Sequence, residues 1–188
     1  NASHCVWSDQ KASAMMAVEK LIALGHREIA FITGSLDSPT GVERLSGYKD
    51  ALARHSIAVN NDLIVEGRWT PETGAAGVET LRQRRVGYSA LVASNDDMAV
   101  GAMKQLHQLG VKVPEQVSVT GFGGYPVGAV AYPGLTTVQF DYEFLGEQAA
   151  RGLLRLLAGE EMLSDSGLPL NFIERESVKA ISREPLFP

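Results

Sequence analysis

Residues 89–102 constrain the fold more than any other part of the chain. Residues 90–93 are a continuous apolar run, which is typical of a strand covered on both faces. Residues 94–97 are polar, and Asn95 is a favourable helix N-cap because its side-chain oxygen can accept the free N–H groups of a first turn. From Met98 onward, apolar residues recur at helical spacing. The sequence therefore predicts a strand, a tight turn and a helix, with Asn95 at the strand end where open parallel sheets bind ligands.

The same alternation runs through most of the chain. We expect strands at 4–8, 28–33, 63–67, 90–93 and 116–122, with helices between them that begin after Asp9, near Ser38 or Thr40, after Thr70 and after Asn95. This pattern predicts an α/β fold, a doubly wound parallel sheet with helices on both faces. Beyond residue 122 we expect a flexible loop at 121–126, a strand at 135–140, a helix capped by Asp141 and a last strand at 172–178.

Composition excludes several function classes. The 188 residues hold 17 basic and 22 acidic side chains, a formal charge of −5 that argues against this chain holding a nucleic-acid backbone by itself. The single cysteine excludes an internal disulfide and a multi-cysteine metal site. Asp96 and Asp97 have no His, Cys or third acid close in sequence, so we expect helix-dipole partners rather than a metal or acid–base site. We expect no metal, no cofactor and no membrane span.

Five segments, in this order, carry a resemblance to a known family: residues 24–32, 43–48, 94–102, 113–122 and 135–138. Together they resemble the effector-binding core of the lactose-repressor (galactose-repressor) family of bacterial transcription regulators, especially repressors of β-glucoside and disaccharide operons. The resemblance covers nearly the whole chain. It implies a cytoplasmic, non-enzymatic, periplasmic-binding-protein-like lobe that binds a sugar effector and forms a homodimer. Operator DNA would be bound only through an N-terminal head that is absent here.

The resemblance also implies a domain organisation. Residues 1–134 would form the C-terminal lobe of the sugar-binding core, 135–160 a segment that normally belongs to the N-terminal lobe, and 161–188 the final strand and tail. Because most of the first lobe is absent, we expect the helix after Asp141 to be displaced, swapped with another copy or buried in a dimer contact. The helix at 98–109, with residues 131–133 nearby, would supply the dimer surface.

Three residues at predicted strand ends or helix starts are the main candidates for the sugar site. A sugar presents hydroxyl rims and apolar faces, so its site needs an aromatic ring and planar polar groups. Trp69 ends a strand, and by the resemblance it lies against the sugar; a partly buried core Trp is the alternative. Arg44 carries a rigid fork that can bridge two hydroxyls, unless it is a surface Arg paired with Glu43 or Asp50. Asn95 offers a donor and an acceptor besides a helix cap.

The remaining candidates concern the character of the cleft. Thr40 is either a helix cap or a cleft hydroxyl, and Ser38 is a weaker candidate of the same kind. The family usually carries an acid just after the strand that ends at Phe122, but residues 123–126 read Gly-Gly-Tyr-Pro, so a charge-assisted acceptor is lost. Phe122, Tyr125 and Phe140 make the cleft more aromatic. We interpret this as a site for a bulkier or less polar glycoside, a disaccharide or an aryl β-glucoside.

Two rival functions remain. Residues 121–124 follow a strand and read Gly-Phe-Gly-Gly, like a dinucleotide-binding fingerprint of a dehydrogenase. That fingerprint would need glycine at Pro126, and we expect proline there to prevent a helix start with free amides. A periplasmic sugar-binding protein of a transporter would share the architecture, and fold alone cannot separate it from a regulator. The N-terminal sequence, a helix-turn-helix head or a signal peptide, would decide.

Overall fold

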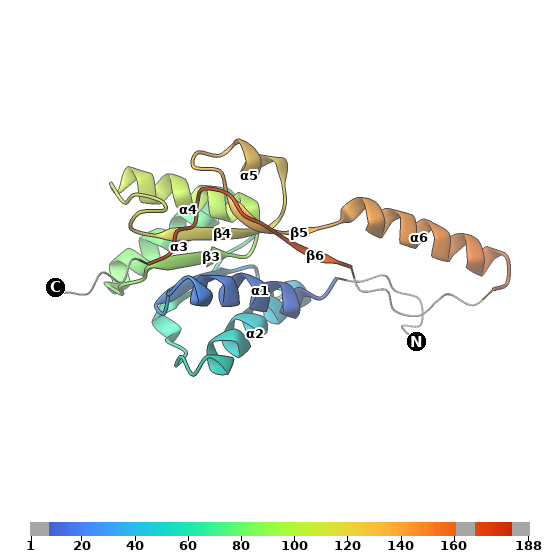
Figure 1. Ribbon diagram of the computed structural model, residues 1–188, viewed down its shortest axis with the longest axis horizontal. Helices are drawn as coiled ribbons and strands as arrows, with labels where there is room; N and C mark the ends of the chain where they lie inside the picture. Colours follow the sequence, from blue (N-terminus) through green and yellow to red (C-terminus); the bar gives the residue numbers. More distant parts are fainter. Residues whose placement is uncertain (1–7, 161–167, 182–188) are drawn as a thin grey trace.

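A single mixed sheet forms the centre of the protein, whose computed structural model describes residues 8–160 and 168–181. Within these residues the strand order is β2-β1-β3-β4-β5-β6. The first five strands pair in parallel, whereas β6 runs antiparallel to β5 (Figure 1). The strands are β1 (Ile29–Thr33), β2 (Ile64–Glu66), β3 (Ala90–Ala93), β4 (Ser118–Gly123), β5 (Thr136–Phe140) and β6 (Leu170–Ile173).

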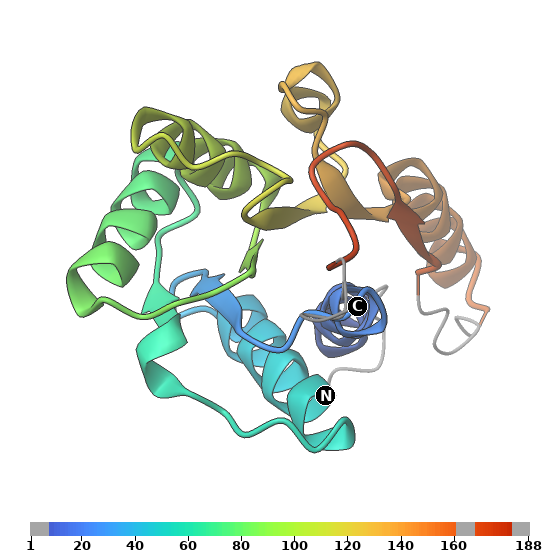
Figure 2. The same ribbon diagram turned by 60° about the vertical axis from the view of Figure 1, so that its left-hand side comes forward.

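Helices cover both faces of this sheet, as the alternating pattern predicts. The pair α1 (Gln10–Ala23) and α2 (Pro39–Arg54) packs on one face, and the pair α3 (Pro71–Arg84) and α4 (Asp96–Gln108) packs on the other (Figure 2). All residues of β1 and β3 are buried, because both faces of these central strands are covered. The α/β doubly wound fold class is therefore confirmed. No helix in the described part of the chain has the length and apolar content needed to cross a membrane.

Local capping signals place the helix starts accurately. At four helices the predicted cap accepts a hydrogen bond from a backbone N–H of the first turn, which satisfies one of the donors left free there. The pairs are Asp9 with Ala12 (2.7 Å), Thr70 with Thr73 (3.4 Å), Asn95 with Met98 (2.8 Å) and Asp141 with Phe144 (2.9 Å). Ser38 occupies the cap position of α2 but makes no side-chain cap bond.

After β4 the structure departs from the expectation in three places. The predicted loop at 121–126 is strand up to Gly123, and Pro126 begins the short helix α5 (Pro126–Val130). A helix does begin at Pro126, because proline suits the first helical position, where its missing N–H would be unpaired anyway; our expectation holds only in that this first residue offers no free N–H. The last strand covers residues 170–173 instead of 172–178, and it is antiparallel, which makes the sheet mixed. The predicted strand at 4–8 lies outside the described residues except for Ser8.

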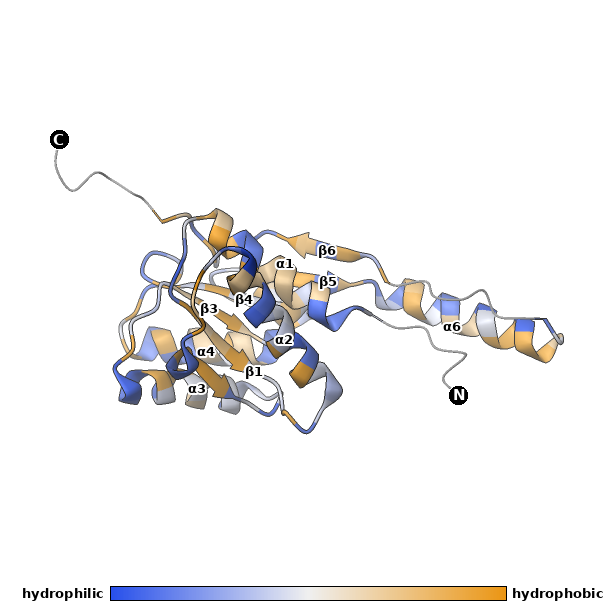
Figure 3. Ribbon diagram, turned by 90° about the horizontal axis from the view of Figure 1, so that it is seen from below, coloured by the Kyte–Doolittle hydropathy of each residue, from blue (hydrophilic) through white to orange (hydrophobic). Residues whose placement is uncertain are grey.

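The helix α6 (Tyr142–Leu157) stands away from the rest of the described protein (Figure 1). Its side chains Leu153, Leu154 and Leu157 are 59%, 67% and 77% exposed. Figure 3 shows apolar positions along α6, which projects beyond the apolar centre of the sheet. The segment 135–160 therefore has two parts in this structure. Its strand β5 pairs with β4 in the same sheet as β1–β3, and its helix α6 lies away from that sheet.

Candidate functional site

Arg44 lies at the centre of a cluster beside the carboxyl ends of the parallel strands. It comes from the second turn of α2 and is only 6% exposed. Its Nη1 donates a hydrogen bond to the backbone carbonyl of Ser94, which follows β3. Its Nε and Nη2 both donate to Oε1 of Gln10, over 2.9 and 2.7 Å. The guanidinium is thus held between α1 and the end of a central strand.

Three aromatic rings surround this guanidinium. Its central carbon lies 4.8 Å from the ring centroid of Phe122, 5.6 Å from that of Phe140 and 5.8 Å from that of Trp69. These distances are within the range of cation–π contacts. Burial lowers the pKa of Arg44 to about 10, so the group keeps its charge at neutral pH.

The alternative of a surface arginine paired with an acid does not hold. Among the described residues, no carboxylate forms an ion pair with Arg44, and Asp50 is paired with Lys11 at 2.5 Å instead. The cationic charge of Arg44 is therefore stabilised by the ring faces and by two neutral oxygens, those of Gln10 and Ser94.

Trp69 forms the partly exposed side of the cluster. It follows β2 in a left-handed backbone conformation, with φ at 67°. Its carbonyl accepts a hydrogen bond from Nδ2 of Asn95 at 2.8 Å. Its indole lies directly on Gly34 after β1, where the Cβ of any other residue would come within 2.0 Å of the ring. The indole is therefore positioned by a glycine beneath it and by an amide behind it.

Asn95 has a structural role that uses half of its hydrogen-bonding capacity. Its Oδ1 caps α4 and its Nδ2 holds the carbonyl of Trp69. A carboxamide carries two N–H groups and two acceptor lone pairs, so one donor and one acceptor position remain. Asn95 can therefore cap α4 and contact a ligand at the same time, and the structure shows the cap.

Asp96 fixes the loop that carries Tyr125. It is fully buried, its Oδ2 accepts the backbone N–H of Tyr125 at 2.6 Å, and its Oδ1 accepts the hydroxyl of Thr137 at 2.6 Å. Burial raises the pKa of this carboxyl above its ordinary value. The sequence predicts only a partner of the helix dipole, whereas the structure shows a buried carboxylate that accepts hydrogen bonds from two distant groups. Its partners lie 29 and 41 positions away, so no local pattern reveals them.

The glycine pair at the end of β4, Gly123 and Gly124, leaves room for the ring of Tyr125. Gly123 and Gly124 have φ values of 122° and 71°, a region that side chains rarely adopt. The ring of Tyr125 lies over Gly123 and would be 2.7 Å from a Cβ there. Phe122 and Phe140 are 0% and 2% exposed, so they enclose Arg44, whereas Tyr125 is partly exposed.

The structure brings together six of the seven predicted site residues. Thr40 is the exception: it shares a face of α2 with Arg44, four residues earlier, at a partly exposed first turn. Gln10 and Gly34 were missed by sequence reasoning, because a helix-starting Gln and a turn Gly carry no local signal of a distant partner. Whether the cluster binds a ligand stays a prediction.

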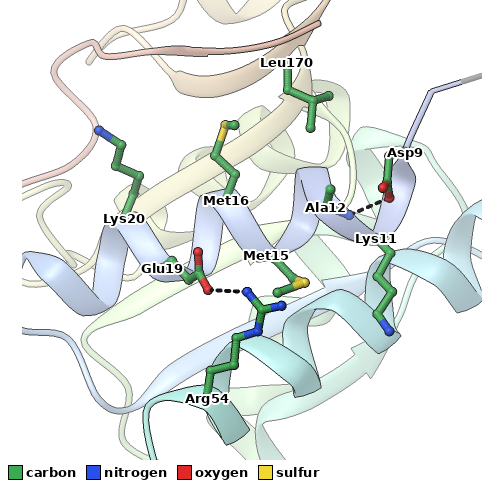
Figure 4. Close-up of a pocket in the computed structure, with 9 residues that line it drawn as sticks. All are labelled: Asp9, Lys11, Ala12, Met15, Met16, Glu19, Lys20, Arg54 and Leu170. Carbon is green, nitrogen blue, oxygen red and sulfur yellow. Dashed lines mark hydrogen bonds and ion pairs between the residues drawn. The ribbon is translucent and has the colours of Figure 1, made fainter. Parts of the chain in front are cut away.

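A separate hollow of about 570 Å³ lies over α1 (Figure 4). It is lined by the apolar side chains of Ala12, Met15, Met16 and Leu170 and by the ion pair of Glu19 with Arg54 at 3.6 Å. None of the predicted site residues lines it. In the described part of the chain, no cluster of His, Cys, Asp and Glu is suited to hold a metal ion.

Comparisons with known proteins agree with this architecture. Residues 18–178 match the family model described as a periplasmic binding protein-like domain. The HTH-type transcriptional regulator AscG of Escherichia coli (strain K12) is 50% identical over 97% of this chain and 54% of its own length. The chain thus spans about half the length of that curated relative.

Two solved structures are also similar. A sugar-binding transcriptional regulator of the LacI family from Escherichia coli, in complex with phosphate, has a TM-score of 0.92 at 49% identity, over 96% of this chain and 65% of its own. A complex of the transcriptional regulator CelR with cellobiose has a TM-score of 0.87 at 31% identity, over 94% of this chain and 55% of its own.

Proposed function

We propose a function from one premise: the chain belongs to the family of periplasmic binding protein-like domains, and within it to the LacI-type transcriptional regulators, which are not enzymes. The chain is the effector-binding part of a bacterial regulator whose affinity for DNA is switched by a sugar. The sugar is a disaccharide or a β-glucoside. The DNA-binding part, and with it the regulator's action in the cytoplasm, belongs to the whole regulator; this chain spans about half the length of its relative AscG.

The cluster around Arg44 carries this proposal. A guanidinium and an indole sit side by side at the carboxyl ends of parallel strands, which is where ligands bind in open α/β sheets. The guanidinium can bridge neighbouring hydroxyls, and the partly exposed ring of Trp69 can take the apolar face of a sugar. Tyr125 adds a second partly exposed ring, which suits a ligand with two rings rather than one. The relative CelR is solved with cellobiose, a disaccharide.

The change in DNA affinity requires a second lobe, which can take different positions relative to this one. The leucines of α6 that are exposed in this chain would pack on the first lobe of the whole protein, so that residues 142–157 belong to that lobe. Sugar bound between the lobes favours one arrangement of the two. A ligand shifts such an equilibrium only by its difference in affinity between the two arrangements. DNA affinity then follows the arrangement.

We assign the homodimer contact to the side of the lobe formed by α4 and the segment after α5. There Tyr132 is 100% exposed and lines a hollow together with Met103 of α4, and Val130, the last residue of α5, is 83% exposed. Apolar side chains that gather into a contiguous exposed patch mark interaction sites. The alternative, a periplasmic binding protein of a transporter, is disfavoured because the relatives named above are transcriptional regulators.

A binding screen on the full-length protein tests the proposal. Thermal shift and calorimetry with glucose, galactose, cellobiose, lactose and aryl β-glucosides should give binding of a disaccharide or a β-glucoside, and operator affinity should change with the same ligand. A monosaccharide that binds more tightly than every disaccharide refutes the ligand class. No binding across the panel refutes sugar sensing itself.

A further inference from the structure

The guanidinium of Arg44 has an uneven distribution of hydrogen bonds. An arginine carries five N–H donors. Three of them are used inside the protein: Nε and Nη2 each give one to Gln10, and Nη1 gives one to Ser94. Two donors therefore remain for a ligand. Because the guanidinium is planar and rigid, the groups that accept its other three N–H donors also set the direction of these two.

Gln10 is itself held in place. Its side-chain Nε2 donates to Oγ of Ser8 at 2.5 Å, so the carboxamide oxygen is the atom that faces Arg44. Its backbone carbonyl accepts the hydroxyl of Ser13 at 2.7 Å, within the first turn of α1. The side-chain amide of Gln10 therefore cannot turn its NH₂ group towards the guanidinium without losing its hydrogen bond to Ser8.

The two helices that carry this pair are in direct backbone contact. Gly47 of α2 faces the carbonyl of Lys11, and a Cβ at residue 47 would lie 2.2 Å from that oxygen. The contact lies one residue along α1 from Gln10 and three residues along α2 from Arg44. The distance between the two side chains is thus set by a close helix crossing rather than by flexible loops.

We propose that Gln10 is a positioning residue of the effector site, which directs the two remaining donors of Arg44 at the sugar; the proposal rests on the proposed function. A single oxygen that accepts both Nε–H and Nη2–H fixes the plane of the guanidinium as well as its place. The ring faces of Phe122, Phe140 and Trp69 attract the charge, but they do not select one rotation of its donors. Because no described carboxylate pairs with Arg44, Gln10 and Ser94 are the groups that set this rotation.

The test compares two substitutions in the full-length protein, with cellobiose as the ligand in calorimetry. Gln10→Leu removes the acceptor at similar size, and Gln10→Glu keeps an oxygen in its place. We expect Gln10→Leu to weaken binding by about tenfold to a hundredfold, the usual effect of a lost hydrogen bond to a charged group, and Gln10→Glu to stay within about threefold of the wild type. Gln108→Leu, an exposed glutamine at the end of α4, is the matched control and should bind as the wild type does.

A double-mutant cycle separates positioning from a structural role. In an Arg44→Leu background, Gln10→Leu should have no further effect on binding, because the group it positions is gone. Equal losses in both backgrounds, or no recovery with Gln10→Glu, overturn the proposal, and melting temperatures of all variants identify a loss of folding. If the wild type binds cellobiose and Gln10→Leu binds it equally well, only this proposal fails. If the wild type binds no sugar of the panel, the proposed function fails and takes this proposal with it.

Discussion

Gly34→Ala tests whether the indole of Trp69 is held in place by the backbone beneath it. A Cβ at residue 34 would lie 2.0 Å from Cη2 and Cζ2 of the indole and 2.5 Å from Cε2. Carbon atoms in ordinary contact are about 3.5 Å apart, so the ring has to move by roughly 1.5 Å. The φ of Gly34 lies outside the left-handed region, and the three atoms nearest to the added Cβ all belong to the ring of Trp69.

The displaced ring should cost binding more than folding. Trp69 is partly exposed, so the indole can swing towards solvent and the free energy of unfolding should fall by less than about 2 kcal/mol. A ring that no longer stacks on the sugar loses about 0.5–1.5 kcal/mol, and its contact with Arg44 about 0.5–1 kcal/mol more. Their sum, about 1–2.5 kcal/mol, corresponds to a fall in sugar affinity of about fivefold to seventyfold.

Fluorescence and calorimetry with cellobiose measure both consequences. A Trp7→Phe background leaves Trp69 as the one indole of this chain, so a change in its emission reports the displacement. Gly87→Ala is the matched control, because no atom lies within 4 Å of a Cβ at residue 87. If Gly34→Ala binds cellobiose as tightly as Gly87→Ala does, with the same emission, the backbone does not position this ring and the reasoning is refuted.

Three further predictions concern single residues. Trp69→Ala should abolish sugar binding in calorimetry while thermal melting stays close to that of the wild type; unchanged affinity would reject its role. Asp96→Asn places an NH₂ group against a buried N–H or hydroxyl donor, and should lower the free energy of unfolding in urea by about 1–3 kcal/mol. Burial lowers the pKa of His26, so below pH 6.5 the unfolded chain binds a proton that the folded chain does not. Stability should therefore fall on acidification, by at most about 1.4 kcal/mol per pH unit, and His26→Gln should flatten this slope in urea titrations at pH 5–8.

The parts of the fold that follow from sequence are those with a local physical cause. Continuous apolar runs predict β1 and β3, because in a strand covered on both faces the side chains on both sides are buried. Asp9 and Asn95 predict the starts of α1 and α4, because a cap bonds within its own first turn. The direction of β6 has no such cause. It depends on which edge the chain reaches after α6, and four residues of an edge strand do not encode that choice.

The residues of the candidate site also differ in whether a local pattern predicts them. The positions at strand ends and the family resemblance predict Arg44, Trp69 and Asn95, and the structure brings these three residues together. The residues that hold them are found only in space. Gln10 lies 34 positions from the guanidinium it binds, and Gly34 is identified by the ring that lies on it. Sequence thus indicates the candidate groups of the site, whereas their orientation is set by partners that no local pattern identifies.

The absent acid after β4 and the aromatic character of the cluster are one change rather than two. A side chain at residue 123 would need a φ near 122° and would meet the ring of Tyr125 at 2.7 Å. At residue 124, with φ at 71°, it would meet Gln139 at 2.5 Å. Tyr125 thus occupies the space that an acidic side chain at residue 123 would require. It is held there by Asp96 through its own backbone N–H. A carboxylate and this tyrosine are therefore alternatives at this edge of the sheet. Restoring the acid would require moving the ring of Tyr125 and would therefore make the cluster less aromatic.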